Sequence, residues 1–278
     1  MEFTPLHHKP VVYGSEWADL AFIVLVCLHA LAGAAGTVSG VVAMVSVKGK
    51  RRHVQAGTIF VRSMAAAALT GIVLDAIRLT LHVTENHTGY PGMAMPSSYP
   101  ARIAFLYAAV CILYLLRQGV NRRVFSRKRT TPVSPGDRLA PAVLLAIGAC
   151  LTVLIYARLS PFTGALWMIW TFMAGVLMSA RVRVGAATNA AMNVVEHRFN
   201  MLLLVGFSWW AALQGFGPAL ALQISGPGES PGQYLGDKPG SYDPAFWLYL
   251  LVWVPPFLLA AWLYRRFARR RAAQGRPG

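Results

Sequence analysis

Acidic side chains are scarce in this chain of 278 residues, which has 10 Asp and Glu against 26 Lys and Arg. Charged residues make up 13% of the sequence, about half the share of a soluble domain, and 56% of residues are hydrophobic. This composition excludes an ordinary soluble domain and predicts an all-α, polytopic membrane bundle. The excess of positive charge flanks apolar stretches, so we interpret it as a topology signal and expect no nucleic acid partner.

Several common site motifs are also missing. The three cysteines, Cys27, Cys111 and Cys150, each fall within an apolar stretch, where a thiol acts as a packing residue, so we expect no disulfide framework. The sequence has no P-loop, no Gly-x-Ser-x-Gly elbow, no Cys-x-x-Cys pair and no His-Glu-x-x-His. The last apolar stretch contains no Lys, which excludes a retinal Schiff base. The first 15 residues do not have the pattern of a removable signal peptide.

Seven apolar stretches are long enough to cross a bilayer. Because lipid offers the backbone no hydrogen-bond partners, each is expected to be a helix. The predicted helices cover residues 18–47, 54–83, 101–121, 139–157, 163–183, 200–223 and 245–265. The domain layout is therefore an external N-terminal segment, a single transmembrane domain and a basic tail, at residues 1–17, 18–265 and 266–278.

Positive charge predicts the orientation of these helices. By count, 19 of the 26 Lys and Arg fall in four patches, at 48–52, 122–138, 181–198 and 265–276. If each patch is cytoplasmic, seven helices place the N-terminus outside and the C-terminus inside. Basic clusters beside a helix attract anionic lipid headgroups. We therefore predict lipid headgroup contacts at Lys48–Arg52, Arg122–Arg129 and Arg265–Arg271.

Small residues line the first two predicted helices. The first contains Gly36-x-x-x-Gly40, and the second contains Ser63, the run Ala65–Ala68 and Gly71. Helices in lipid associate through close backbone approach, which small residues permit. The two stretches are therefore expected to pack as a tight antiparallel pair.

The same hairpin contains most of the ionisable residues that are predicted to lie within the membrane. These are His29, Arg62, Asp75, Arg78 and His82. Such groups are costly in lipid and usually mark a functional site. We therefore consider how they are arranged along the two helices.

Counting outward from the basic turn compares their depths. His29 lies 22 residues before Arg51 and Asp75 lies 22 after His53, so both are expected about 33 Å from the turn. If the stripe of the second helix that carries Asp75 faces the first helix, His29 is predicted to hydrogen-bond or pair with Asp75. Arg78, on the same stripe, is predicted to hold an anion or a carboxylate.

These three residues, His29, Asp75 and Arg78, are the candidate catalytic or proton-handling groups. The structural alternative is that the long helices project beyond the bilayer. The polar stripe is then wet, and His29 is a packing residue.

A second candidate site lies at the predicted cytoplasmic ends. His53 opens the second helix, and His197 precedes the sixth, with Met201 one turn further along. If these two helices are neighbours, the imidazoles can ligate a b-type heme or a metal, and Met201 is an alternative soft ligand. The structural alternative is that interfacial histidines cap a helix or contact lipid phosphate.

A weaker metal site is predicted in the loop after the second helix. His82, His87, Met93 and Met95 combine imidazole with thioether, which suits copper(I). The alternative is a loop of ordinary surface residues.

The start of the chain resembles a family of bacterial multi-pass membrane proteins of unknown function. The shared pattern is His29-x-x-Ala32-Gly33, then Lys48-Gly49-x-x-x-His53-x-x-x-Gly57-x-Ile59-Phe60, then Ser63-Met64. A later His-x-x-x-Met is matched by His197 and Met201, and Asn193 stands where the family has an aromatic residue. The resemblance implies the bacterial cytoplasmic membrane and a common role for His29, His53 and His197, but no particular activity.

Three functional hypotheses follow from these patterns. The leading one is a redox-linked membrane protein that binds a heme b or metal at His53 and His197, or handles a quinone. The second is a small-molecule or ion transporter, because Asp75 and Arg78 accompany helix-breaking residues in the sixth and seventh helices, which are Gly215, Gly217, Pro218, Pro255 and Pro256. The third is a non-catalytic assembly subunit in which the small-residue hairpin is a packing device.

Overall fold

A computed structural model describes residues 15–81, 99–125, 129–158, 163–190 and 192–225. The described residues form six α-helices, one short 3-10 helix and no strand, which confirms the all-α prediction. The elements are α1 (Glu16–Val45), α2 (Arg51–Leu81), α3 (Tyr99–Val120), η2 (Arg122–Phe125), α4 (Pro135–Arg158), α5 (Thr163–Thr188) and α6 (Met192–Ser225). The predicted seventh helix, 245–265, and the predicted tail lie outside the described residues.

Two helices begin before their apolar stretches do. α4 starts with a reciprocal cap, because Ser134 Oγ accepts from the Asp137 backbone N–H at 3.1 Å and the Asp137 carboxylate accepts from Ser134 N–H at 3.2 Å. α6 starts at Met192, eight residues before its predicted boundary of 200. Its first two turns mix apolar with polar residues, and most of these residues are buried in the fold, so the apolar pattern did not mark them as helix.

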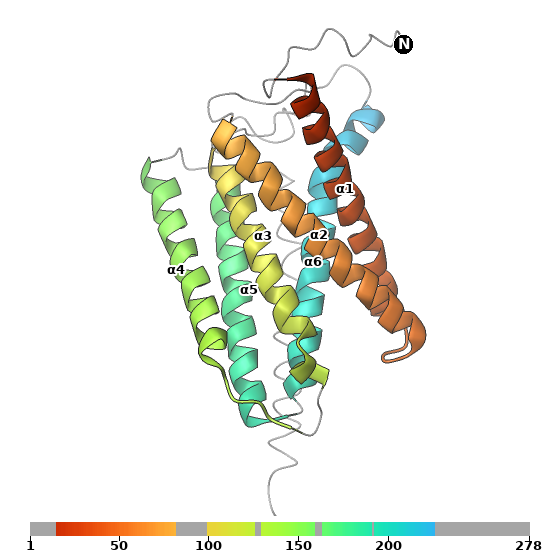
Figure 1. The fold of residues 1–278 in the computed structure, drawn as a ribbon, viewed down its shortest axis with the longest axis vertical. Coiled ribbons are helices and arrows are strands. Elements are labelled where there is room, and N and C mark those ends of the chain that lie inside the picture. The colour runs from red at the N-terminus through yellow and green to blue at the C-terminus, as the bar shows by residue number, and fades with distance from the viewer. Residues whose placement is uncertain (1–14, 82–98, 126–128, 159–162, 191, 226–278) are drawn as a thin grey trace, which may run out of the picture.

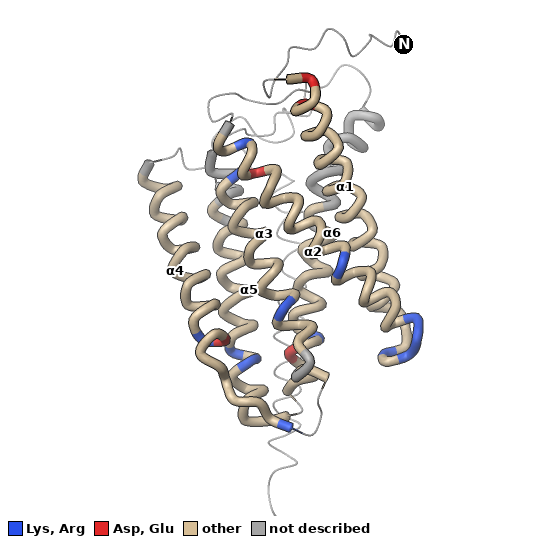
Figure 2. The backbone as a smooth tube through the Cα atoms, viewed as in Figure 1, with Lys and Arg blue, Asp and Glu red and all other residues tan. Residues whose placement is uncertain are grey.

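The helices run alternately up and down (Figure 1). The turn between α1 and α2, the segment from α3 to α4 and the turn between α5 and α6 therefore meet at one end of the bundle. Three of the four basic patches lie there, and Figure 2 shows most of the Lys and Arg at this lower end. We call it the basic end.

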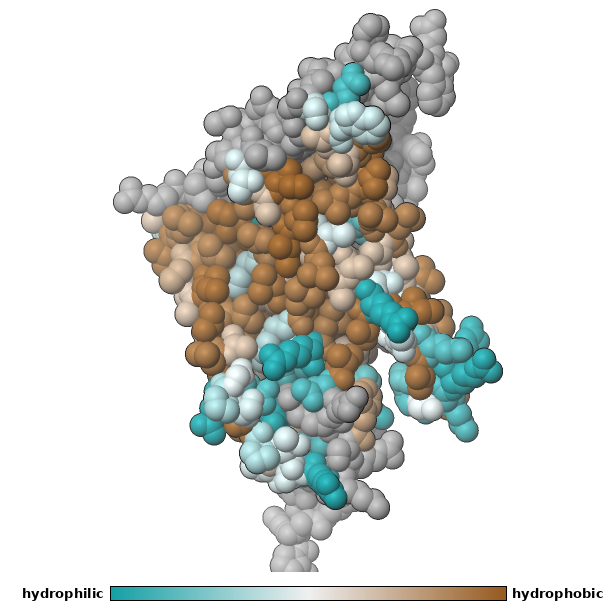
Figure 3. All heavy atoms as spheres, in the orientation of Figure 1, coloured by the Kyte–Doolittle hydropathy of each residue, from teal (hydrophilic) through white to brown (hydrophobic). Residues whose placement is uncertain are grey.

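Four of the described helices are long and apolar enough to cross a membrane. The qualifying segments are Glu16–Val45, Arg51–Thr80, Arg102–Val120 and Pro135–Ala157. On the face that Figure 3 shows, an apolar band covers the middle of the bundle and hydrophilic residues gather at the basic end. The fold is therefore compatible with a multi-pass membrane protein.

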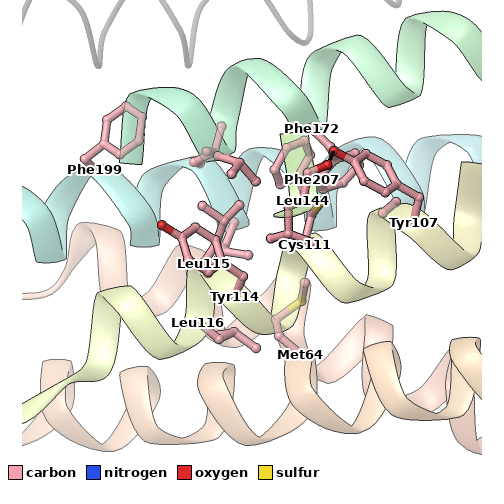
Figure 4. Packing of buried hydrophobic residues seen from close by; sticks show 14 of the residues in the cluster. Met64, Tyr107, Cys111, Tyr114, Leu115, Leu116, Leu144, Phe172, Phe199 and Phe207 are labelled. Atoms are coloured by element: carbon pink, nitrogen blue, oxygen red, sulfur yellow. Dashed lines mark hydrogen bonds between the residues drawn. The ribbon is translucent and has the colours of Figure 1, made fainter. Parts of the chain in front are cut away.

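The core lies where α3, α5 and α6 pack against one another. α4 packs mainly on α5, whereas α1 packs on both α2 and α6, and α2 packs on α1 and α3. Figure 4 shows members of the apolar cluster, which come from α2 to α6. Its centre includes the stacked rings of Phe172 and Phe207, whose centroids lie 3.9 Å apart.

Glycines of α1 set its distance from its neighbours. A Cβ on Gly36 would lie 3.1 Å from Met64 Sδ, and one on Gly40 would lie 3.0 Å from both Phe60 of α2 and Val205 of α6. Thr37 Oγ1 also donates to the Ser208 carbonyl at 3.3 Å. The predicted tight pair of α1 and α2 is confirmed, and α1 makes an equally close approach to α6.

Gly40→Val is expected to destabilise the bundle, because the added carbons must displace Phe60 and Val205. Overpacking of this kind costs about 1–3 kcal/mol. The matched control is Gly33→Val in the same helix, because a Cβ at Gly33 meets nothing within 4 Å. Thermal unfolding in detergent is the measurement. Equal melting temperatures for the two variants would show that α1 does not depend on this approach.

Candidate functional site

His29 binds backbone and hydroxyl groups of α2. Its Nδ1 donates to the Ala67 carbonyl at 2.9 Å and lies 3.1 Å from Thr70 Oγ1. Gly71 leaves room for the ring, because a Cβ there would lie 3.2 Å from His29 Cε1. His29 is therefore seated against a small-residue stretch of α2.

The predicted bond between His29 and Asp75 is wrong. His29 meets α2 about four residues closer to the turn, at Ala67 to Gly71. Arg51 and His53 are not symmetric about the turn between α1 and α2, so equal counts from them do not reach equal depths on the two helices. Four residues correspond to one helical turn, or about 6 Å.

Asp75 instead pairs with a residue that the sequence analysis did not consider. Arg102 of α3 places Nη1 3.4 Å from Asp75 Oδ1, and the Asp75 side chain is 8% exposed against 17% for Arg102. This ion pair joins α2 to α3. A buried carboxylate is expected to have a charged partner, and Arg102 fills that role.

Arg78 lies one turn from Asp75 and faces α1. Its guanidinium carbon lies 5.0 Å from the centre of the Phe22 ring, a cation–π contact. Its Nε is buried and has no hydrogen-bond partner among the described residues. Arg62 is exposed on α2 and does not join this group, and His82 lies outside the described residues.

At the basic end, His53 and Lys48 bind the last turn of α1. His53 Nδ1 donates to the Ala43 carbonyl at 2.8 Å. Lys48 Nζ donates to the same carbonyl at 3.0 Å and to that of Met44 at 2.7 Å. These carbonyls belong to the last four of the helix, which have no partner within it. The two side chains therefore cap α1.

His197 binds the last turn of α3 in the same way. Its Nδ1 donates to the Gly119 carbonyl at 2.7 Å, and its ring lies 5.2 Å from that of Phe125. Met201 lies over the same glycine, because a Cβ on Gly119 would clash with the Met201 methyl group. The structure thus brings His197 and the alternative ligand Met201 to one residue of α3.

The surroundings of His197 favour its neutral form. Burial lowers the pKa of His197, and the nearby His53, Arg198 and Lys48 lower it further, against the opposing effect of the Gly119 hydrogen bond. Burial and Arg198 also lower the pKa of Lys48. His53 is therefore close enough to affect His197 electrostatically. The helices that carry them, α2 and α6, do not pack closely on each other, and α1 packs on both, so the assumption that the two helices are neighbours is wrong.

The three described histidines share one tautomer. A carbonyl oxygen can only accept, so each Nδ1 must carry the proton, which leaves the lone pair of a neutral ring on Nε2. A metal-binding histidine has this arrangement.

Within the described ranges, no three His, Cys, Asp or Glu come together as a metal site. The loop candidates His82, His87, Met93 and Met95 lie outside the described residues.

One arginine of the predicted basic patch at 181–198 is buried. Arg183 is 1% exposed, which its place in that patch does not predict. Its Nε donates to the Asp137 carboxylate at 3.2 Å, and its Nη2 donates to the carbonyls of Thr131 and Pro132 at 3.0 and 2.7 Å. Asn193 Nδ2 also donates to the Arg129 carbonyl at 3.2 Å. Part of the predicted polybasic linker is therefore fastened to α5 and α6.

A set of buried polar side chains near the basic end was also missed. Those on α6 are spaced three and four residues apart, and those on α5 four apart, which places each set on one helix face. The residues are Gln118, Ser179, Arg183, Asn193, Glu196 and Asn200. The spacing is visible in the sequence, but apolar stretches were used to define the helices.

The ion pair between Asp75 and Arg102 is expected to couple α2 to α3. Replacing either residue by Leu leaves the other charge of the pair buried without its partner. The double variant removes both charges of the pair. The double variant should therefore be more stable than the sum of the single losses predicts, by roughly 0.5–3 kcal/mol. Chemical unfolding in detergent measures this coupling, with Arg62→Leu as an exposed control on α2. Strict additivity would mean that the two charges do not interact.

Arg183→Met is expected to release the segment that the arginine holds. Amide hydrogens at residues 129–134 should exchange faster, because two carbonyl contacts and the bond to Asp137 are lost. Hydrogen exchange with mass spectrometry tests this. The matched control is Arg181→Met, since Arg181 is exposed two residues away. If both variants exchange at the wild-type rate, Arg183 does not hold the segment.

Comparisons with known proteins found no relative of this chain. No protein-family model, no curated protein and no solved structure matches the chain. The likeness over residues 29–64 therefore remains a resemblance, and the functional argument depends on the residues of this chain.

Proposed function

We propose that this chain is a seven-pass protein of the bacterial cytoplasmic membrane that binds a b-type heme between His53 and His197 and takes part in redox chemistry. The basic end then faces the cytoplasm, and the N-terminus lies outside. The charge pattern supports this orientation, because basic patches from three separate parts of the chain meet at one end. Lys48, Lys50, Arg51 and Arg52 are exposed there, where they can contact anionic lipid headgroups.

One observation carries the heme proposal. His53 and His197 lie at the same end, and each donates its Nδ1 proton to a carbonyl in the last turn of a helix. Each ring is thereby held in orientation and keeps the Nε2 lone pair that an iron ligand needs. The lowered pKa of His197 acts in the same direction, because a protonated imidazole cannot bind iron.

The available donors fit a heme better than a metal ion held by protein alone. A protein-held ion usually needs three or more side-chain ligands, and no such group exists among the described residues. A heme supplies four ligands from its own ring and asks two from the protein, which two imidazoles satisfy. When bound, it would supply one-electron chemistry. The carbonyls of Ala43 and Gly119 orient the two imidazole rings and keep the proton of each neutral ring on Nδ1 rather than on Nε2.

The outer cluster supports an accompanying role in proton or substrate handling. Asp75 is 6% exposed and paired with Arg102, and Arg78 lies one turn away. Ionisable groups at this depth commonly bind substrates or transfer protons. His29 lies nearer the turn, against Ala67, and would act as a separate group.

A reduced-minus-oxidised absorption spectrum of the purified full chain tests the heme proposal. The wild type is expected to show a Soret band. His53→Ala and His197→Ala should each shift or abolish it, because each substitution removes one of the two iron ligands and changes the coordination of the iron. The matched control is His29→Ala, which removes an imidazole of the same tautomer from a different part of the bundle and should keep the band.

Two results would contradict the proposal. One is a wild-type protein without a Soret band after expression with excess heme. The other is a band that both substitutions at the basic end leave unchanged, which would place any heme elsewhere.

A further inference from the structure

The core between α5 and α6 changes from apolar to polar as it approaches the basic end. Phe172 stacks on Phe207, and a Cβ on Gly175 would lie 2.9 Å from Leu203. These two contacts fix the antiparallel register of α5 and α6. From Phe172 to Gly175 the residue number rises by three on α5, and from Phe207 to Leu203 it falls by four on α6. Moving toward the basic end by one turn on each helix gives the next facing positions.

The register places Ser179 level with Asn200, and Arg183 level with Glu196. Ser179, Asn200 and Glu196 are fully buried, and Arg183 is 1% exposed. Two successive layers of the α5–α6 contact are thus polar, although the layers before them are aromatic and aliphatic. Buried polar groups in a membrane bundle are expensive and commonly functional.

Three atoms in these layers lack a hydrogen bond. Ser179 Oγ, Asn200 Oδ1 and Arg183 Nη1 are buried and have no partner within the described part of the chain. Nearly all buried polar atoms in native proteins bond to protein or to ordered water. The three atoms lie in adjacent layers, so a common ligand can satisfy them.

The mixture of donors and acceptors identifies the ligand. Arg183 Nη1 can only donate, Asn200 Oδ1 can only accept, and the Ser179 hydroxyl does both. A bound anion would leave the amide oxygen without a donor, and a bound cation would face the guanidinium. Water both donates and accepts, so it suits all three atoms.

We propose that Ser179, Arg183, Glu196 and Asn200 line a hydrated inlet that opens at the basic end and gives Glu196 access to protons. Arg183 connects the inlet to the surface, because it also binds the carbonyls of Thr131 and Pro132. The stacked rings of Phe172 and Phe207 close its far side. The inlet does not depend on a heme, since it uses neither His53 nor His197.

Thiol labelling tests whether the layer is wet. Ser179→Cys in the full chain, reconstituted in liposomes, is treated with a small charged methanethiosulfonate, and modification is followed by peptide mass spectrometry. The matched control is Val176→Cys, one turn further along the same buried stripe. Native Cys111, which is also fully buried, is an internal dry reference. A hydrated site should react at least roughly tenfold faster than a dry one. Equal rates for the two variants would overturn the inlet.

The stability of Ser179→Ala gives an independent answer. If the hydroxyl binds water, its removal loses hydrogen bonds and lowers the melting temperature. If the layer is dry, the substitution removes an unpaired buried group and raises the melting temperature, which would overturn the proposal. Ser63→Ala on α2 corrects for the higher helix propensity of alanine. Both readouts are independent of heme, so a missing Soret band and a dry inlet are separate results.

Discussion

The close approach of α1 to two neighbours at once is the contact on which the arrangement of the hairpin depends. Lipid tails are as apolar as side chains, so helices in a bilayer gain little from hiding apolar surface and must gain from tight contact. Gly40 supplies that contact because Phe60 and Val205 pack against its bare backbone. The register that follows seats His29 beside Gly71 and Phe22 beneath Arg78.

The sequence was sufficient to predict the helices and the antiparallel hairpin, because both follow from local patterns. Apolar stretches mark helices, and small residues at Gly36 and Gly40 mark a contact face. The partner of Asp75 did not follow, because Arg102 comes from another helix and no local spacing links the two. Counting along a hairpin carries an error of one turn, which was enough to assign His29 to the wrong residue.

Composition also hid the difference between two uses of arginine. Arg181 and Arg183 are neighbours in one basic patch, and both were interpreted as topology signals. Arg181 is exposed, whereas Arg183 is buried against Asp137. The difference lies in which side of α5 each faces, and α5 is so evenly apolar that the sequence gives little sign of its buried side. The ion pair with Asp137, in the cap of α4, is what distinguishes the buried Arg183 from the exposed Arg181.

At the basic end, capping a helix and binding a ligand are compatible roles for the same histidine. α1 and α3 both end there, and the last carbonyls of a helix carry partial negative charge and lack partners. His53 and His197 satisfy carbonyls of Ala43 and Gly119 with Nδ1, which is a structural role. That bond fixes the proton on Nδ1 and leaves Nε2 available. A histidine that caps a helix through one nitrogen thereby keeps the lone pair of the other, which the proposed heme ligation requires.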